Sequence, residues 1–471
     1  MAIMTLLVLP GMARLCAENV TIANSNPNQP AAPQLRLSCE WIAMPHAEAN
    51  RLIHSHAANP DPGNALHASA EKLMAAGVGK LVQQQLIHAI SGQQIKAGTL
   101  RHFPYPTEHD APMVSTKVVM QGGNVIQGDF RRAEPSSFQT QDLGFDLSVE
   151  CTVDDTGHLA DLNLAANWTA HADDQKWGQG LSEISLPVFQ RCSVFTQALC
   201  RHDSWKLVAQ LRPTAPAPAA AAQPFASDRV LLFIKATMDE PGPAAAPDAT
   251  SVQEISVLHE WIELDSQIAD SMMDGIPGSG VTAGLRAAAQ GLLDAGKATL
   301  IDSTYQITRS GQKSKIESVL EFPFPTAHST PKVPLTIIEL PAPTPPLPIT
   351  RPVFWPTPAC PQSLERHLAG TSIEVEAVAS DDGTTLDIST APQIHLPVGL
   401  QPHGHGSGFV TQPRFATLKS ATRILLKPSQ SALLDSYESM PPSSLRVLSP
   451  ASPPTGNPKR RILLFITAGL Q

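Results

Sequence analysis

The 471-residue chain has little charge, few aromatic side chains and no excess of basic residues. Charged residues make up 16% and aromatic residues 5%, and 42 Asp and Glu outnumber 33 Lys and Arg, which gives a net charge of −9. A nucleic-acid partner would require a basic face that neutralises its phosphates, so the composition argues against such a partner. Beyond the N-terminal segment, no apolar run approaches the roughly 18 residues that a membrane-spanning helix needs.

Cysteine is also scarce, with six residues, whereas proline is abundant, with 44. Residues 1–17 contain a short apolar run and then the small-residue site Leu15-Cys16-Ala17, which predicts a secretory signal peptide followed by a polar tail at 18–34. The segment lacks the usual basic residues, and an ordinary apolar N-terminus is the alternative. Cleavage would leave Cys39, Cys151, Cys192, Cys200 and Cys360. Export permits disulfides, but an odd number of cysteines leaves the pairing open.

An internal repeat organises the rest of the chain. The segment AGKATLIDSTYQITRSGQKSKIESVLEFPFPT at 295–326 aligns without a gap to 76–107, with 11 of 32 positions identical. We therefore divide the chain into a first half at 35–238 and a second half at 252–471, joined by a Pro/Ala linker at 239–251. The repeated positions, which we interpret as structural, are Glu40, Trp41, Gly77, Ser91, Gly92, Gln93, Lys96, Phe103, Pro104, Gly144 and Gly157 in the first half, and Glu260, Trp261, Gly296, Ser310, Gly311, Gln312, Lys315, Phe322, Pro323, Gly370 and Gly383 in the second.

Each half reads as a β-sheet domain with one embedded helix. The segments at 63–77 and 282–296 have a helical pattern that ends at a glycine, and alternating strands surround them. Ser-Gly-Gln predicts a hairpin turn in both halves. The fold class expected is therefore α+β, mainly antiparallel β. Segments too rich in Pro, Ala and Ser to pack a core lie at 212–228, at 439–460 and in an insert at 327–362.

The order of these signals resembles the core domain of bacterial secretins, the ring-forming outer-membrane channels of type II and type III secretion systems and type IV pili. The similar stretches in the second half are GKATLIDS at 296–303, TRSGQ at 308–312, FPF at 322–324, the strand region at 370–388 and LLFIT at 463–467. The first half repeats the last two at 144–164 and 231–234. The resemblance covers most of both halves in the same order.

This resemblance implies two tandem secretin-like modules, which would pair through open sheet edges into a ring. It also implies a gate between the Phe-Pro motif and the following strand. The first half has a short hairpin there, within 110–135, whereas the second half has the Pro-rich insert. The chain departs from the family by having two cores and by lacking paired glycines at 204–211 and 430–437. A pore-forming protein and a soluble scaffold are both compatible with the sequence.

Motifs for chemistry are weak. GLLDAGK at 291–297 has phosphate-loop spacing, but Ala298 stands where such a loop needs Ser or Thr, and we interpret it as a helix C-terminus. HEWIE at 259–263 lacks the second histidine of a zinc motif, so a buried Trp261 beside a solvent-facing or paired Glu260 is the simpler interpretation. The His-x-His pairs at 54–56 and 403–405 lack a third ligand.

The sequence therefore predicts an exported, non-enzymatic protein of the periplasm or outer membrane. We expect no catalytic, cofactor or metal site and no small-molecule substrate. The expected partners are further copies of the chain or other envelope and secretion proteins, with contact to the outer membrane as part of the channel interpretation. Two alternatives are a soluble scaffold that docks to envelope machinery and a hydrolase with a site shared between the halves, which no motif supports.

Overall fold

The computed structural model describes residues 33–56, 63–122, 124–212, 228–239, 253–274, 284–341, 357–438 and 460–471. Residues 33–471 form one compact unit. The predicted signal peptide, nearly all of the polar tail and all but the first residue of the predicted linker at 239–251 lie outside the described residues, as does most of each Pro-rich segment.

Both halves contain a strand, two helices and then a series of strands. The first half comprises β1 (Gln34–Met44), α1 (His46–His56), α2 (Gly63–Ala75), β2 (Lys80–Ile90), β3 (Gln93–Asp110), β4 (Met113–Val114), β5 (Lys117–Gln121), β6 (Asn124–Gln127), β7 (Phe130–Arg131), β8 (Glu134–Val153), β9 (Leu159–Trp177), β10 (Ile184–Arg201), β11 (Ser204–Leu211) and β12 (Arg229–Met238). The second comprises β13 (Glu254–Asp265), α3 (Ser266–Met273), α4 (Leu285–Asp294), β14 (Ala298–Arg309), β15 (Gln312–Pro325), β16 (His328–Ser329), β17 (Thr336–Leu340), β18 (Cys360–Pro361), β19 (Leu364–Ala379), β20 (Leu386–His403), β21 (Val410–Lys419), β22 (Thr422–Leu426), β23 (Gln430–Glu438) and β24 (Arg460–Leu470).

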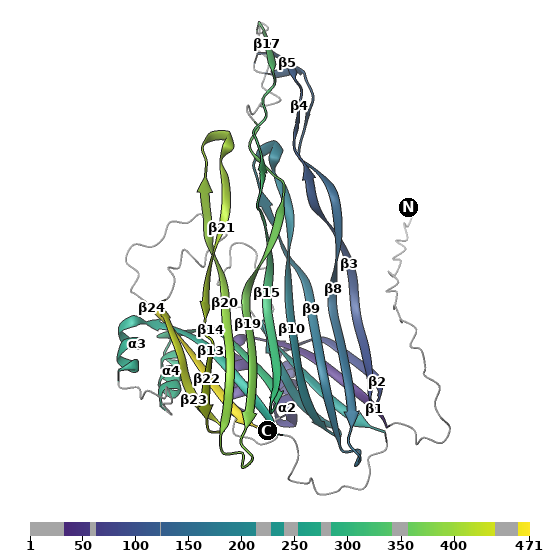
Figure 1. Cartoon of the computed structure of the whole chain (residues 1–471), viewed down its shortest axis with the longest axis vertical. Coiled ribbons are helices and arrows are strands. Elements are labelled where there is room, and N and C mark those ends of the chain that lie inside the picture. The colour runs from purple at the N-terminus through teal and green to yellow at the C-terminus, as the bar shows by residue number, and fades with distance from the viewer. Residues whose placement is uncertain are drawn as a thin grey trace, which may run out of the picture. The chain divides into compact units, whose positions relative to one another are not determined.

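Two large antiparallel sheets contain most of these strands. Sheet A has eight strands in the order β2-β1-β12-β11-β14-β13-β24-β23, and sheet B has nine, with β21-β20-β19-β15-β10-β9-β8-β3 in line and β22 pairing with β20. In Figure 1 the long strands of sheet B stand upright and the strands of sheet A cross their lower parts. In each sheet, four strands of one half lie beside the four equivalent strands of the other.

The two halves share strand register as well as topology. Gln93 faces Cys151 in the β3–β8 pair, and the equivalent β15–β19 pair places Gln312 opposite Ala377. The β1–β2 pair changes register after Trp41, and the β13–β14 pair does so after Trp261. Equivalent bulges and equivalent pairings mean that the same fold is built twice.

Sheet A is covered by sheet B on one face and by helices on the other. The buried Trp41 indole of β1 meets the Phe145 ring of β8 edge-on, with ring centroids 5.2 Å apart. On the helix side, Ile262 and Phe465 form a buried cluster with Ala269 of α3 and Ala289 of α4. Neighbouring strand residues point to opposite faces, which explains why strands of sheet A are apolar on both sides.

The expectation of a mainly antiparallel β protein with few helices is confirmed. The described residues contain four α-helices, so each half has two rather than the one expected. The predicted helices correspond to α2 and α4, whereas α1 and α3 were missed. Each missed helix follows its strand within a residue or two, and the short α3 is held by Asp265, whose side chain accepts from the Gln267 amide at 2.9 Å. None of these four helices is long and apolar enough to cross a membrane.

The segment predicted to contain a gate extends beyond the ends of sheet B (Figure 1). It holds the short pair β4–β7 and the hairpin β5–β6 of the first half. The strand β17 of the second half adds to β5 in parallel, with Ile337 opposite Val118. The two halves therefore also meet at this small three-stranded sheet.

Candidate assembly interface

The two halves join through one pair of strands in each large sheet. In sheet B, β10 and β15 pair over seven positions, from Phe189 opposite Glu321 to Phe195 opposite Lys315. In sheet A, β11 and β14 pair at two positions, Ala209 opposite Gln306 and Gln210 opposite Tyr305. We refer to these contacts together as the internal junction.

A buried carboxylate from the second half holds the internal junction together. Asp302 of β14 lies 2.9 Å from Arg229 of β12 and 3.4 Å from Arg212, which follows β11. All three side chains are buried, and Thr371 of β19 also donates to the carboxylate. Burial alone would raise the pKa of Asp302, but the charges of the two arginines outweigh it and lower the pKa.

His46 completes this cluster in its neutral form. Arg229 donates to its Nδ1 at 3.0 Å, and its Nε2 lies 2.7 Å from the Ser303 hydroxyl. Arginine can only donate, so Nδ1 accepts and Nε2 carries the proton. Burial and then the Arg229 charge lower the pKa of His46 to about 3, which keeps the imidazole uncharged at neutral pH.

A second buried carboxylate, Glu260, also binds groups from both halves. Arg286 of α4 donates to it twice, at 2.6 and 2.7 Å. Asn50 and His54 of α1, in the first half, lie 3.1 and 3.0 Å from the same carboxylate. These hydrogen bonds and the arginine charge overcome burial and hold the pKa of Glu260 far below its usual range.

The equivalent residue of the first half, Glu40, has partners from its own half. His67 of α2 lies 2.8 Å away, in the position that Arg286 takes in the second half, and Gln84 of β2 donates at 3.0 Å. The recurrence of a Glu-Trp pair thus marks a carboxylate that a helix residue binds. Only Glu260 receives additional partners across the internal junction.

Among the strands that the structure describes, the outer ends of both sheets are open edges. β2 and β3 of the first half end the sheets on one side, and β23 and β21 of the second half end them on the other. Positions that the internal junction buries in the second half are exposed in the first. Leu86 is 60% exposed and its equivalent Tyr305 is 5% exposed, while Leu100 is 46% exposed and its equivalent Val319 is 4% exposed.

The remaining repeated positions support turns and close strand contacts. Gly77 and Gly296 follow α2 and α4 with positive φ, and Gly92, Gly311, Gly157 and Gly383 lie in hairpin turns. A Cβ on Gly144 would come within 1.9 Å of the Thr99 carbonyl oxygen, and one on Gly370 within 2.2 Å of the Ser318 carbonyl oxygen.

Several repeated side chains sit in different surroundings in the two halves. Ser91 and Ser310 have the same role in both halves, because each hydroxyl accepts the backbone N–H of the last residue of a neighbouring strand, Val153 of β8 and Ala379 of β19. Lys315 pairs with Glu317 at 2.9 Å. The following equivalent residues occupy the paired strands β3 and β15: Gln93, Lys96, Phe103 and Pro104, and Gln312, Phe322 and Pro323. Phe322 is buried against Trp177, whereas its equivalent lies on the open-edge strand β3.

The segments weighed as chemical motifs have structural roles. Gly296, at the end of the phosphate-loop-like segment, terminates α4 by donating to the Leu293 carbonyl at 3.0 Å. His259 is buried and lies 3.0 Å from the Thr390 hydroxyl, and Trp261 packs in the core. Across the described part of the chain, no group of three or more His, Cys, Asp and Glu side chains is arranged to hold a metal ion.

The five cysteines at 39, 151, 192, 200 and 360 are all buried and carry free thiols. Burial raises the pKa of Cys192 and Cys200 to about 12 and that of Cys151 to about 11. These groups therefore act as small apolar residues of the core.

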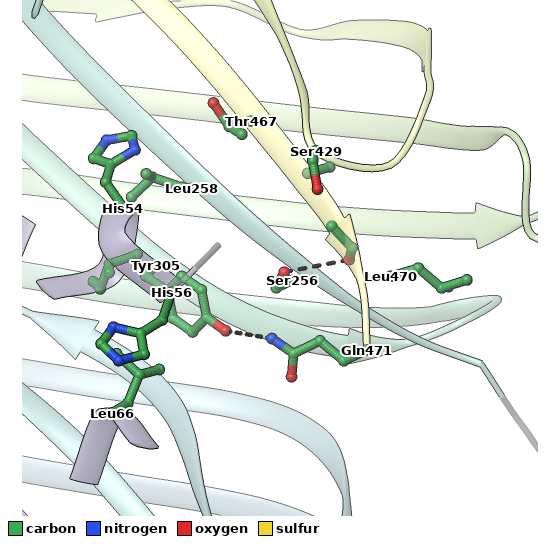
Figure 2. A pocket seen from close by; sticks show the side chains of 13 residues that line it. His54, His56, Leu66, Ser256, Leu258, Tyr305, Ser429, Thr467, Leu470 and Gln471 are labelled. Carbon is green, nitrogen blue, oxygen red and sulfur yellow. Dashed lines mark hydrogen bonds between the residues drawn. The ribbon is translucent and has the colours of Figure 1, made fainter. Parts of the chain in front are cut away.

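A small cavity lies between α1, α2 and the end of β24 (Figure 2). Its volume is about 40 Å³, and Gln471 donates to the Tyr305 hydroxyl at 2.8 Å beside it. A cavity of this size holds a water molecule or two rather than a substrate, since ligand pockets typically measure hundreds of Å³. His54 and His56 at its rim are bound to Glu260 and to the carbonyl of Leu52.

Comparison with known protein families, characterised proteins and solved structures finds no match. Sequence reasoning did not identify Asp302, Arg212 and Arg229 as partners. Asp302 and Arg212 are not repeated between the halves, and the repeat of Arg229 at Arg461 does not indicate its partner. Asp302 is the single acidic residue of β14, which is the signal that could have indicated it. The resemblance to secretins rests on the order of the motifs in the sequence.

Proposed function

We propose that the chain is an exported, non-enzymatic structural component of a bacterial envelope assembly, resembling the secretin core, whose copies join edge to edge into an oligomeric β ring. The observation that carries this proposal is the internal junction. Two halves of equal topology lie side by side in both sheets. The strands at the outer edges, β2 and β3 on one side and β23 and β21 on the other, are equivalent to the strands that pair at the internal junction.

The open edges support self-association on physical grounds. Soluble proteins usually cover, shorten or charge an edge strand, because its unpaired N–H and C=O groups can pair with another chain. Here β3 is 18 residues long, and β2 presents exposed Leu81, Leu86 and Ile90 beside it. Joining unlike edges head to tail yields a closed ring when the rotation per subunit closes.

A non-enzymatic role is supported by the ion pairs and hydrogen bonds of the buried carboxylates. Asp302 and Glu260 are each fully engaged by arginine and further donors, which favours a fixed carboxylate over one that transfers protons. Export to the periplasm or outer membrane is supported by the predicted signal peptide and by the motif order. Contact with other secretion proteins or with the outer membrane belongs to the same proposal.

A soluble periplasmic or surface scaffold is the second candidate. Its support is that the carboxylates at the internal junction are satisfied within one chain, so that a single chain forms a compact unit. Such a scaffold would use the open edges for a different partner and would conduct nothing.

Expression of the full chain in a Gram-negative host, followed by fractionation and negative-stain imaging of detergent-extracted envelopes, tests the proposal. We expect the protein in the envelope fraction as closed rings of many subunits. Recovery of single-chain particles from the periplasmic or cytosolic fraction would overturn the ring and, in the periplasmic case, favour the scaffold.

A further inference from the structure

The internal junction provides a template for a contact between chains. We propose that a second copy of this chain docks its β21/β23 edge onto the β3/β2 edge in the register of the internal junction, but without the buried ion pairs that lock that junction. This inference rests on the proposed self-association and specifies its surface. It also implies that the whole chain is the unit of assembly and that the contact between chains, which we call the outer junction, opens before the chain unfolds.

Equivalence of the edge strands follows from their inner neighbours. Phe189 of β10 faces His171 of β9, and Phe415 of β21 faces Pro397 of β20, each next to a bulge, so β10 and β21 correspond at an offset of 226. The β3–β8 and β15–β19 pairings correspond in the same way, with β3 and β15 offset by 219.

These offsets fix the register of the outer junction in sheet B. Adding 226 to the β10 residue and subtracting 219 from the β15 residue converts Phe189 opposite Glu321 into Phe415 opposite His102. By the same shift, Phe195 opposite Lys315 becomes Ala421 opposite Lys96.

The same shift applies in sheet A. There β11 pairs with β12 in the same way as β23 pairs with β24, and the two pairs have equivalent bulges, after Leu207 and after Leu433. Gln210 opposite Tyr305 therefore becomes Ser436 opposite Leu86. The outer junction thus covers Leu86, whose equivalent the internal junction buries.

The exposed apolar side chains favour a copy of this chain as the occupant. Leu86 and Leu100 lie on the two strands whose second-half equivalents are covered, and both are more than two-fifths exposed. A partner that buries both must supply one strand to each sheet at once, with the spacing that β11 and β10 have in the internal junction. The β23/β21 edge of this chain has that spacing because it repeats the same fold.

The charged residues differ between the two junctions. Gln83 in the outer junction takes the position that Asp302 has in the internal junction. Arg461 takes the position of Arg229. Arg461 pairs within its own half with Asp270, at 2.8 Å. Glu438 takes the position of Arg212, at the end of β23. The outer junction therefore lacks a carboxylate held between two arginines, which leaves backbone pairing and apolar burial as its main contributions.

Cysteine cross-linking between full-length chains tests this register. Leu86→Cys and Ser436→Cys chains are mixed and oxidised mildly, and the matched control replaces Ser436→Cys by Ser431→Cys, five residues and about 17 Å away along the same strand. The five described thiols of the wild-type chain are buried, and Cys16 is replaced by Ser in every chain used, so the wild-type thiols contribute no background. We expect covalent dimers from the first mixture only and a ladder from a chain carrying both L86C and S436C. When the oxidation is carried out in dilute urea that leaves the tryptophan fluorescence unchanged, we expect no cross-links to form.

The outcomes separate this inference from the proposed function. Rings seen by imaging without cross-links at 86 and 436 would overturn the register and leave the ring standing. Cross-linked ladders that image as open filaments would support the register and overturn the ring. Monomers without cross-links would overturn both. If the urea concentration that halves cross-link formation during oxidation coincides with the midpoint of unfolding, the claim that the outer junction opens first is overturned.

Discussion

The buried carboxylate of Asp302 should contribute more to stability than any ion pair on the surface of the sheets. Asp302→Asn removes the negative charge and keeps the shape, which leaves the charges of Arg229 and Arg212 buried without compensation. Removing one partner of a buried ion pair typically costs about 3–5 kcal/mol of unfolding free energy. Because two arginines and Thr371 depend on this one carboxylate, we expect the loss to fall in that range.

Urea unfolding, followed by tryptophan fluorescence, measures this cost. With a urea dependence of about 3 kcal/mol per M, the Asp302→Asn midpoint should fall by about 1 to 1.7 M. The matched control is Asp387→Asn, because Asp387 binds the exposed Arg423 and exposed ion pairs contribute about 1 kcal/mol or less. Equal midpoints for the two variants would refute the assignment of Asp302 as the residue that holds the halves together.

Three further predictions concern the core. Gly144→Ala should destabilise the chain by several kcal/mol, because its Cβ would collide with the Thr99 carbonyl, whereas Gly399→Ala, with a similar φ and open space, should cost less; thermal unfolding of both variants compares them. Burial lowers the pKa of His259 to about 3, so the unfolded chain takes up a proton below pH 6.5 that the folded chain refuses, and stability should fall by about 1.4 kcal/mol per pH unit from pH 6.5 down to about 3. His259→Cys, which copies Cys39 of the first half, should reduce that slope in urea titrations between pH 7 and 5, and an unchanged slope would contradict a buried neutral histidine. The five described thiols should react with a thiol reagent in guanidinium but not in buffer, and rapid reaction of the folded chain would show that the core is open.

Local features of the fold were predictable because the residues that cause them are adjacent in sequence. Gly296 ends α4 and Gly311 turns the following hairpin, and both positions were visible as repeated glycines. The strand pattern of β8 and β9 likewise follows from alternation around the turn at 154–157. The antiparallel class of the protein follows from such hairpins.

Long-range features were not predictable in the same way. Nothing near Asp302 in the sequence indicates Arg229, which lies 73 residues earlier and reaches it only because β11 and β14 are neighbours in sheet A. Glu260 was recognised as a repeated residue, but its partners His54 and Asn50 come from a helix that the sequence pattern did not predict. Each half contributes strands to both large sheets, and this arrangement also depends on contacts between residues far apart in the sequence.

The molar mass of the full chain in mild detergent, measured by light scattering at micromolar concentration, tests the central claim most directly. The claim is that two equivalent halves, already joined edge to edge, continue the same contact from chain to chain until a ring closes. A closed ring would give a single large species whose mass is a whole multiple of 50.2 kDa and does not grow with concentration. A stable 50.2 kDa particle would contradict the ring, because the β2/β3 and β21/β23 edges would then remain unpaired in a folded single chain.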